Sequence, residues 1–571
     1  GVLWHGLSLD CTVAGYVTAF PVLVVLASFW IPLSQRVWRI VLTVYFSLIA
    51  LVTAAIFAVD LNLYGYWGFR LDGSVLIYLS DPGEALASAS WGEVLRQILI
   101  MLVYAGAMIW SYRWILRLFR VEPVPLRGRV VPTVAALLIG GLTFLAIRGG
   151  VTVATANVSK VYFSSNMFLN HAATNPVFSF LSSVGDNENY AEAYPFFEEE
   201  RRKTLFEELR GNRPGADAGT PRLLRSRPNV VLILLESFGR TIMDETVNGE
   251  PVMPNMQRFK REGVWFENFF ANSFRTDRGQ VAVLCGFPAQ TTMSIMKLPR
   301  KSATLPSLAR SLGREGYRSV FMYGGDLNFT NQASFMYSTG WEELIWQKDM
   351  QLDAPTSKWG YADDVVVDLF GDEVEALGRE EQPFLAGLLT LSSHEPFEVP
   401  FAKFDDKLLN AMAFSDAQIG RLIDRLRESP VWDNLLVVLV ADHGYPYPYD
   451  LAYNAPLRHR IPMIWLGGAL ATASRTVDTY ASQIDICATL LAQMGLPHDE
   501  FDYSKNIFGA TPPHKFGYYC FSDGFGVIDA DGETVYDNTG ETVLSQTGPQ
   551  SERLEWGKAM LQTTYEDIGR R

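Results

Sequence analysis

Four long apolar runs, separated by shorter polar segments, occupy the first 150 residues of the chain. They are Thr12–Ile31, Ile40–Val59, Gln97–Leu116 and Val131–Ile147. A helix rises about 1.5 Å per residue, so each run is roughly long enough to cross the hydrocarbon core of a bilayer. Because the runs contain so few interior charges, buried helices of a soluble core are the weaker explanation. The pattern therefore predicts a polytopic α-helical membrane domain at residues 1–150.

The charges between these runs predict their orientation. The loop after the first run and the segment that follows the third are rich in arginine: Arg36, Arg39, Arg113, Arg117, Arg120, Arg127 and Arg129. The loop of residues 60–95 is mainly acidic, with Arg70 against Asp60, Asp72, Asp81, Glu84 and Glu93. The positive-inside rule places arginine-rich loops in the cytoplasm, so residue 1 and the chain after Ile147 are expected outside. Since no signal-peptide pattern opens the chain, we expect a further transmembrane helix before residue 1.

Residues 151–227 change character along their length. Val158–Phe180 mixes apolar and polar residues, which predicts one or two amphipathic helices on the outer membrane surface. Ala191–Leu209 is dense in glutamate and arginine and predicts a solvent-exposed helix. Gly211–Arg227 is rich in Gly, Pro, Asp, Arg and Ser, as a linker is. We therefore expect interfacial helices and a linker here, followed by a second domain at residues 228–571.

The second domain shows strands that alternate with helices. Val230–Leu235 and Leu435–Val440 are continuous aliphatic runs, typical of strands buried on both faces of a parallel sheet. The other expected strands and helices between them are Ser319–Met322, Phe384–Thr390, Leu305–Glu315 and Leu409–Arg427. This alternation predicts a doubly wound α/β domain.

The tail of the chain predicts a small β-rich addition. Its expected strands are Phe516–Phe521, Gly526–Asp529 and Thr534–Tyr536, and Ser551–Ile568 is expected to form a closing helix. We find no candidate chemistry in this tail.

Composition excludes one class of partner and one kind of metal site. The chain has 571 residues, which is too long for one ordinary domain, and a net charge of -14. That negative charge argues against nucleic acid as the main partner. Its four cysteines are widely scattered, so no cysteine pair with metal-ligand spacing exists.

Metal-binding side chains follow two of the buried strands. Glu236 comes directly after Val230–Leu235, and Asp442 and His443 come after Leu435–Val440. The carboxyl ends of strands in open α/β sheets are where ligands bind. Two carboxylates and one imidazole, joined by one hydroxyl group, make a site that suits Mn²⁺ or Mg²⁺, with Zn²⁺ as a further alternative.

The hydroxyl group comes from the polar loop at residues 271–280, where Thr276 lies between Arg275 and Arg278. Guanidinium groups bind the oxygens of anionic phosphorus or sulfur centres. A divalent metal lowers the pKa of a hydroxyl and so prepares it to attack such a centre. The pattern predicts Thr276 as a nucleophile.

In these motifs the chain resembles the lipoteichoic acid synthase family, within the alkaline phosphatase and sulfatase superfamily. The matching motifs are Pro228–Ser237, Arg275–Gly279, Ser392–Phe397 and Val440–Gly444. The resemblance implies a sulfatase-like catalytic domain that faces away from the cytoplasm. It also implies one divalent metal, usually assigned as manganese, and Thr276 as both a ligand and the nucleophile. The full implied ligand set is Glu236, Thr276, Asp442 and His443.

The same resemblance implies substrate contacts. His394 falls on the family's substrate-phosphate histidine, and Trp359 falls near its headgroup-contacting tryptophan. Arg278 is a further candidate for substrate binding. Tyr323 stands in a segment where the family's first synthases carry a histidine, which leaves the headgroup open. For His459 we favour a structural role.

The implied function is a transferase in a bacterial inner (cytoplasmic) membrane. It would move a phospholipid headgroup, glycerol phosphate before phosphoethanolamine, through a phospho-threonine to a cell-envelope glycan or lipid acceptor. A phosphodiesterase-type hydrolase is the alternative with water as the acceptor. A strict sulfatase is disfavoured because Cys285–Pro288 lacks the Cys/Ser-x-Pro-x-Arg motif. A non-catalytic binding protein is disfavoured because all four metal positions hold competent residues.

Overall fold

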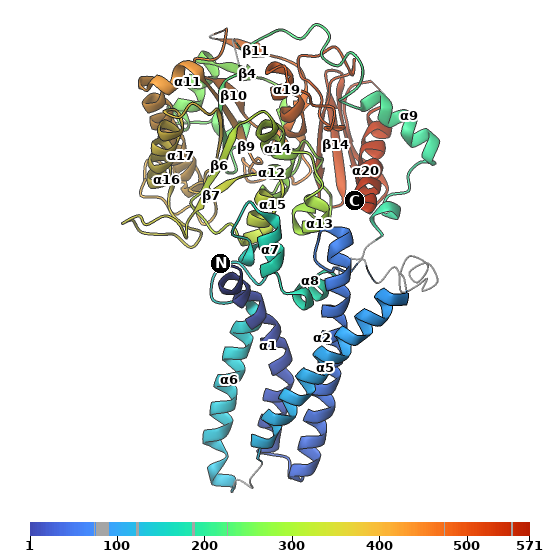
Figure 1. Cartoon of the computed structure of the whole chain (residues 1–571). Coiled ribbons are helices and arrows are strands. Elements are labelled where there is room, and N and C mark those ends of the chain that lie inside the picture. Colours follow the sequence, from blue (N-terminus) through green and yellow to red (C-terminus); the bar gives the residue numbers. More distant parts are fainter. Residues whose placement is uncertain are drawn as a thin grey trace. The chain divides into compact units, whose positions relative to one another are not determined.

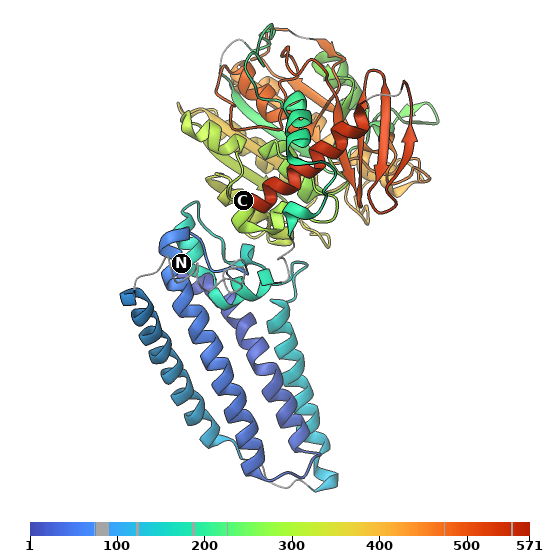
Figure 2. The same cartoon turned by 90° about the vertical axis from the view of Figure 1, so that its right-hand side faces the viewer.

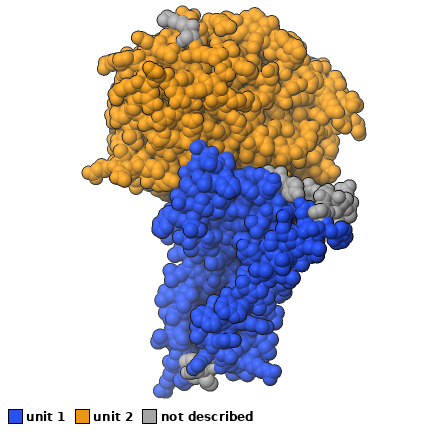
Figure 3. Space-filling model, viewed as in Figure 1, with its two compact units in different colours: residues 1–188 blue, residues 189–571 orange. Residues whose placement is uncertain are grey.

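The computed structural model describes residues 1–73, 75, 91–120, 125–184, 189–224, 227–472, 474–549 and 552–571. The chain forms two compact units, residues 1–188 and residues 189–571 (Figure 3). Of the acidic loop that predicts the orientation, Asp81 and Glu84 lie outside the described residues. The finer division into residues 1–150, 151–227 and 228–571 stays a prediction.

The first unit is built on four long helices, which confirms the four predicted apolar elements (Figure 2). They are α1 (Val2–Ser28), α2 (Gln35–Trp67), α5 (Trp91–Leu118) and α6 (Val130–Arg148). By length and composition, all four can cross a membrane. Within this unit α1 packs beside α6, and α2 packs beside α5. Most of their large apolar side chains are exposed, as lipid-facing side chains are.

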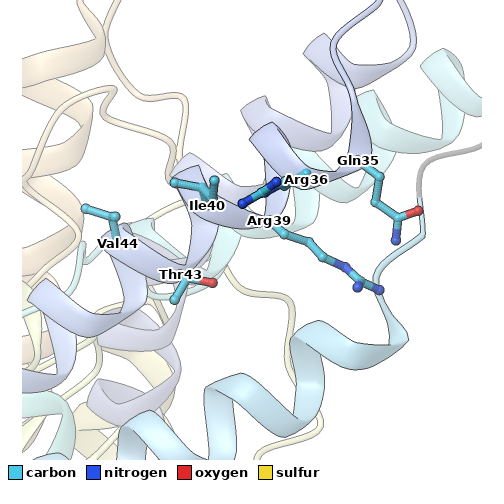
Figure 4. A pocket seen from close by; sticks show the side chains of 6 residues that line it. All are labelled: Gln35, Arg36, Arg39, Ile40, Thr43 and Val44. Carbon is cyan, nitrogen blue, oxygen red and sulfur yellow. The ribbon is translucent and has the colours of Figure 1, made fainter.

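The start of α2 holds the end of α5. Gln35 Nε2 and Arg39 Nη2 both donate to the carbonyl oxygen of Phe119, over 3.1 and 3.0 Å. A cation at the last carbonyls of a helix stabilises that helix end. A cavity of about 370 Å³ lies here. Figure 4 labels the side chains that line it: Gln35, Arg36, Arg39, Ile40, Thr43 and Val44. Since its lining residues include no carboxylate, histidine or cysteine, we assign this end of the helices a structural role.

Short helices form the segment Val158–Phe180, where the sequence predicts one or two amphipathic helices. They are η2 (Val158–Val161), α7 (Met167–Ala173) and α8 (Pro176–Ser183). Asn166 and Asn175 begin α7 and α8, because their side chains accept hydrogen bonds from backbone N–H groups of the first turn. The predicted helices are confirmed, and their position on a membrane surface stays a prediction.

An eight-stranded sheet forms the centre of the second unit (Figure 1). Its order is β11 (Arg475–Val477), β4 (Val264–Phe266), β10 (Met463–Leu466), β9 (Leu435–Ala441), β1 (Asn229–Leu235), β8 (Phe384–Leu389), β6 (Arg318–Tyr323) and β7 (Glu343–Trp346). The strands from β9 to β7 are parallel, and β10 is antiparallel to both of its neighbours. The aliphatic strands β1 and β9 are buried along their whole central length, as their composition predicts.

Helices pack on this sheet in two groups, between which Figure 1 shows the strands. One group is α11 (Pro254–Glu262), α16 (Asp363–Leu377) and α17 (Lys407–Glu428), and the other is α12 (Thr276–Cys285), α14 (Leu308–Arg314) and α19 (Ile486–Gln493). The predicted fold class, a helical membrane domain with an α/β domain, is confirmed. The sheet is mixed because antiparallel strands extend one side of its parallel part.

A four-stranded antiparallel sheet and a long helix end the chain. The strands are β13 (Gly517–Phe521), β14 (Gly524–Asp529), β15 (Gly532–Asp537) and β16 (Thr542–Gln546), and the helix is α20 (Arg553–Arg570). Three of these strands and the helix match the predicted elements, and β16 was not predicted. Thr542–Gln546 is the most exposed strand of this sheet, so it lacks the apolar alternation that reveals a strand.

One expected surface helix is partly buried. The glutamate-rich helix α9 (Glu199–Leu209) packs against α20 and buries Arg202, Leu205, Phe206 and Leu209. Arg202 Nε lies 3.0 Å from Glu566 Oε2 in that contact. The predicted solvent-exposed helix thus has an exposed polar face and one buried face, because two aliphatic side chains and one aromatic at helical spacing are enough to bury that face.

Candidate metal centre and nucleophile

The ends of two neighbouring parallel strands bring Glu236, Asp442 and His443 together. Strand β1 pairs with β9 up to Leu235 and Ala441, so the next residues of both strands emerge side by side. His443 Nε2 lies 3.6 Å from Glu236 Oε1 and 3.6 Å from Asp442 Oδ2. One ligand atom from each of the three residues lies within 4.8 Å of the others. The predicted set of three metal ligands thus meets at one sheet edge.

Thr276, the predicted nucleophile, opens helix α12 directly beside this cluster. Its hydroxyl donates to Glu236 Oε2 over 3.1 Å and lies 3.5 Å from His443 Nε2. Helix α12 comes this close because Gly279 has no side chain: a Cβ there would lie 2.0 Å from the carbonyl oxygen of Asp442. All four residues of the implied ligand set therefore share one site.

Ser237 holds the two carboxylates in place. Its backbone N–H donates to Asp442 Oδ1 over 2.8 Å, and its hydroxyl donates to Glu236 Oε1 over 2.7 Å. Ser237 has a φ of 61°, a left-handed conformation that is strained for a residue other than glycine. Strain of this kind persists only where the surroundings enforce it, and here it turns the chain so that one residue reaches both carboxylates.

The cluster fits a divalent cation. Asp442 Oδ2 is buried and has no hydrogen-bond partner among the described residues. Burial, and then the charge of Glu236, raise the pKa of Asp442 well above its usual value, and burial lowers the pKa of His443. Two buried carboxylates with an unpaired oxygen are unfavourable unless positive charge lies between them. Carboxylate oxygens, an imidazole nitrogen and a hydroxyl are competent donors for Mn²⁺, Mg²⁺ or Zn²⁺.

A cavity of about 420 Å³ opens over Thr276 and the cluster. Three of the predicted substrate-binding residues, Tyr323, Trp359 and His394, line it. Arg278 is not among its lining residues; it is buried, and its guanidinium carbon lies 5.4 Å from the centre of the Phe274 ring. Substrate binding by Arg278 stays a prediction without support from the cavity.

Trp359 and His394 contact each other although 34 residues separate them in sequence. Their ring centres are 4.6 Å apart with an angle of 54° between the planes. Trp359 Nε1 donates to the carbonyl oxygen of Glu395 over 2.7 Å, and His394 Nδ1 lies 2.8 Å from the same oxygen. Both rings are therefore oriented by one backbone carbonyl at the cavity rim.

The loop that carries His394 is fixed to the metal cluster at its start. Thr390 Oγ1 accepts a hydrogen bond from the backbone N–H of Glu236 over 2.8 Å. Ser393 Oγ donates to the carbonyl oxygen of Glu236 over 2.6 Å. Displacing this loop would displace Glu236 as well, so the predicted substrate-binding and metal-binding positions are coupled.

Asp363, at the start of α16, is the anchor of that loop. Its carboxylate accepts hydrogen bonds from the backbone N–H groups of Leu391 and Ser392, over 2.7 and 3.2 Å, and from Ser415 Oγ over 2.6 Å. Since Asp363 is buried, water cannot take the place of its carboxylate as the acceptor for these three donors. Asp363 does not line the cavity and acts as a positioning residue.

We expect Asp363→Asn to destabilise the second unit by roughly 2–4 kcal/mol, because an amide NH₂ would face donors that now meet a carboxylate. Chemical denaturation of the full chain in detergent measures this. Asp364→Asn is the matched control, because Asp364 is the next residue of the same helix turn and is only partly buried; it should change stability by less than about 0.5 kcal/mol. Equal effects of the two substitutions would contradict the anchoring role.

Other residues of the cavity have no clear signal in the sequence. Phe274, Tyr453 and Arg458 line it together with the predicted residues, and so does Tyr445 of the segment Tyr445–Tyr449, whose alternating Tyr and Pro residues predict a stiff loop at the rim of the site. His459 does not line it; this histidine is buried and stacks on Tyr519 with ring centres 3.9 Å apart. Burial lowers the pKa of His459 to about 3, so the ring is neutral at ordinary pH.

Comparison with known proteins shows what the second unit is similar to. Residues 228–496 match the sulfatase family model. Phosphoglycerol transferase I of Xanthomonas campestris pv. campestris is 33% identical over 293 residues, which are 47% of this chain and 41% of that protein. Lipoteichoic acid synthase 1 of Bacillus subtilis is 26% identical over 325 residues, 49% of this chain and 48% of that protein. The chain thus spans less than half the length of these curated relatives.

Solved structures show the same fold. A protein of the alkaline phosphatase superfamily from Vibrio parahaemolyticus superposes with a TM-score of 0.57 at 23% identity, over 66% of this chain and 98% of that chain. The lipoteichoic acid synthase LtaP from Listeria monocytogenes superposes with a TM-score of 0.54 at 18% identity, over 64% and 98%. These comparisons confirm the resemblance stated from the four sequence motifs.

Proposed function

We propose that the chain is a metal-dependent membrane transferase. The premise is the match of residues 228–496 to the sulfatase family model. The chain would move a phospholipid headgroup, glycerol phosphate in the first place, to a cell-envelope glycan or lipid acceptor. The observation that carries this proposal is the hydroxyl of Thr276, 3.1 Å from Glu236 in a buried cluster of metal-binding residues. The names of the phosphoglycerol transferase and lipoteichoic acid synthase relatives support the choice of headgroup.

In the first step Thr276 Oγ1 attacks the phosphorus of the lipid phosphodiester. Glu236, Thr276, Asp442 and His443 would hold the divalent cation, which when bound lowers the pKa of the hydroxyl and offsets charge on the phosphoryl oxygens. Glu236 Oε2 already accepts the hydrogen bond of the Thr276 hydroxyl and is placed to receive its proton. The bond from phosphorus to the diacylglycerol oxygen breaks, and a phospho-threonine diester remains.

His394 is placed to serve the leaving group and the acceptor. With its Nδ1 held at 2.8 Å from the carbonyl oxygen of Glu395, its Nε2 is left for a substrate oxygen. Nε2 would give a proton to the diacylglycerol oxygen in the first step. In the second step it would take a proton from the acceptor hydroxyl, which attacks phosphorus and displaces the oxygen of Thr276; that oxygen would take its proton back from Glu236.

A lipid donor explains why this domain shares a chain with four apolar helices. We propose that the helices are membrane-spanning in a bacterial cytoplasmic membrane and that the catalytic domain is extracytoplasmic. The donor phospholipid would then lie in the outer leaflet. The arginine-rich loops before Ile40 and after Leu116 support this orientation through the positive-inside rule.

Phosphoethanolamine is the second candidate headgroup, and one observation favours it. The partly exposed ring of Trp359 lines the cavity beside Phe329, with ring centres 5.5 Å apart. Aromatic faces attract ammonium groups, and glycerol phosphate carries none.

Product analysis tests the proposal. The full chain in detergent with Mn²⁺ is given phosphatidylglycerol or phosphatidylethanolamine with a fluorescent acyl chain, with a short glucose oligosaccharide or a glycosyl diacylglycerol as the acceptor. We expect fluorescent diacylglycerol from phosphatidylglycerol and the headgroup on an acceptor. Free glycerol phosphate without acceptor product would indicate a hydrolase, and no diacylglycerol from either lipid would refute headgroup transfer.

A further inference from the structure

Arg458 lies in the short helix α18 (Pro456–His459), in the segment between β9 and β10. This segment packs directly against the residue that follows His443: a Cβ on Gly444 would lie 2.0 Å from the carbonyl oxygen of Arg458. Arg458 therefore enters the site from the chain that turns back after the metal ligands. It lines the same cavity as Thr276 and is only 6% exposed.

The guanidinium of Arg458 has no acidic partner. No ion pair joins it to a carboxylate in the part of the chain that the structure describes, and its Nε and Nη1 are buried there without a hydrogen-bond partner. Arg460, two residues later, shows the ordinary arrangement, because its Nη2 lies 2.8 Å from Glu267 Oε1. A buried cation with unused donors is unfavourable and is rare unless a ligand satisfies it.

Aromatic rings hold this guanidinium, and its Nε and Nη1 have no hydrogen-bond partner among the described residues. The Arg458 Cζ lies 3.8 Å from the centre of the Tyr453 ring and 5.8 Å from the centre of the Phe274 ring. Stacking occupies the flat face of a guanidinium, whereas its donors point outward in the plane of the group. The stack on Tyr453 thus fixes the position of Arg458 and leaves its Nε and Nη1 donors for another molecule.

The natural ligand of such a group is an oxyanion. A planar guanidinium with free donors matches the two oxygens of a phosphate bidentately, which an ammonium group cannot do. Arg275, which also lines the cavity, is exposed and keeps its hydration, so it is a weaker candidate for this role. Because Arg458 stays protonated throughout, it contributes charge and hydrogen bonds and transfers no proton.

We propose that Arg458 binds the non-bridging oxygens of the donor phosphodiester while Thr276 attacks its phosphorus. This inference rests on the proposed function and adds a substrate-contacting residue that neither the sequence motifs nor the resemblance indicates. As the bond from Thr276 Oγ1 to phosphorus forms and the bond to the diacylglycerol oxygen breaks, negative charge on those oxygens grows. Arg458 then stabilises the transition state more than the bound lipid.

The first test pairs variants with a substrate that lacks one of these oxygens. Phosphatidylglycerol and its methylphosphonate analogue, in which a methyl group replaces one non-bridging oxygen, are compared on the wild-type chain, Arg458→Gln and Arg458→Lys. On phosphatidylglycerol we expect kcat/KM to fall roughly 100-fold or more in Arg458→Gln, mainly in kcat, and less in Arg458→Lys. On the analogue the loss should shrink to less than about 10-fold, because the analogue already lacks the negative charge and one of the two oxygens that Arg458 binds.

Arg475→Gln is the matched control, because Arg475 is an exposed arginine on strand β11 of the same domain. It should leave both substrates unaffected within about 2-fold. Equal losses on both substrates in Arg458→Gln, or no loss on phosphatidylglycerol, would overturn the proposal. Arg458→Lys keeps the charge and most of the side-chain stem, so it decides the outcome if Arg458→Gln does not fold.

A second measurement separates this inference from the proposed function. Calorimetric titration of glycerol phosphate into the resting full chain with Mn²⁺ needs no turnover. Binding that weakens about 10-fold or more in Arg458→Gln and is unchanged in Arg475→Gln would support Arg458 as the anion site even if no lipid is turned over. One result would refute the Arg458 assignment alone: the wild-type chain turns over phosphatidylglycerol, and Arg458→Gln and Arg458→Lys match it in turnover and in binding.

Discussion

Replacing Thr276 with alanine will stop the release of diacylglycerol from phosphatidylglycerol. The loss should be at least about 1000-fold in kcat, because the attacking oxygen itself is removed and the rest of the site only binds and orients. A purified full-length variant in detergent, assayed with a fluorescent acyl chain on the lipid, measures this directly. The helix that Thr276 opens is otherwise unchanged, and alanine is a good helix former, so the variant should fold.

Thr276→Ser is the informative companion. Serine keeps an oxygen at the same distance from Glu236, so we expect measurable turnover, reduced by less than about 100-fold. Normal turnover of Thr276→Ala would contradict the nucleophile assignment. Loss of turnover in both variants, with unchanged stability, would show that more than the hydroxyl is needed at this position.

Replacing Asp442 with asparagine will remove the bound divalent metal. The unpaired Asp442 Oδ2 is buried beside Glu236 and His443, so the substitution removes a charged ligand from the centre of the cluster. We expect metal content, measured by mass spectrometry of the dissolved protein, to fall from one ion per chain to less than about one-tenth. Diacylglycerol release should fall together with it by at least about 100-fold.

Asp433→Asn controls for the loss of an acidic residue, because Asp433 is exposed just before the opposite end of strand β9. It should keep both metal and turnover. An Asp442→Asn variant that retains a full metal complement would show that the cluster does not hold the ion. A variant that loses the metal and keeps full turnover would show that the ion does not serve the reaction.

The core of the fold could be predicted because burial on both faces leaves a clear pattern. Val230–Leu235 and Leu435–Val440 contain only aliphatic residues, and these became the central strands. Strands at the sheet margins are short and mixed in composition, as at Arg475–Val477 and Glu343–Trp346, and were not predicted. Strand direction also could not be predicted: Met463–Leu466 is wholly apolar, as its neighbour β9 is, but it runs antiparallel, because the chain before it turns back through α18.

The site could be predicted where a residue's position depends on the end of a strand. Glu236, Asp442 and His443 were found this way, since adjacent parallel strands end at one edge of a sheet. Ser237 was not found, because its role depends on a left-handed backbone turn. Arg458 was not found either. Its importance depends on lacking an acidic partner, which only the packed structure shows, and its neighbour His459 is the more conspicuous residue in the sequence.

The mass of the chain after incubation with the donor lipid alone tests the central claim most directly. The full chain is incubated with phosphatidylglycerol without acceptor, quenched in acid and examined by intact-protein and peptide mass spectrometry. We predict an added mass equal to one glycerophosphoryl group, located on Thr276 and absent from Thr276→Ala. An unmodified chain that nevertheless releases diacylglycerol, or an adduct on another residue, would contradict covalent transfer through Thr276.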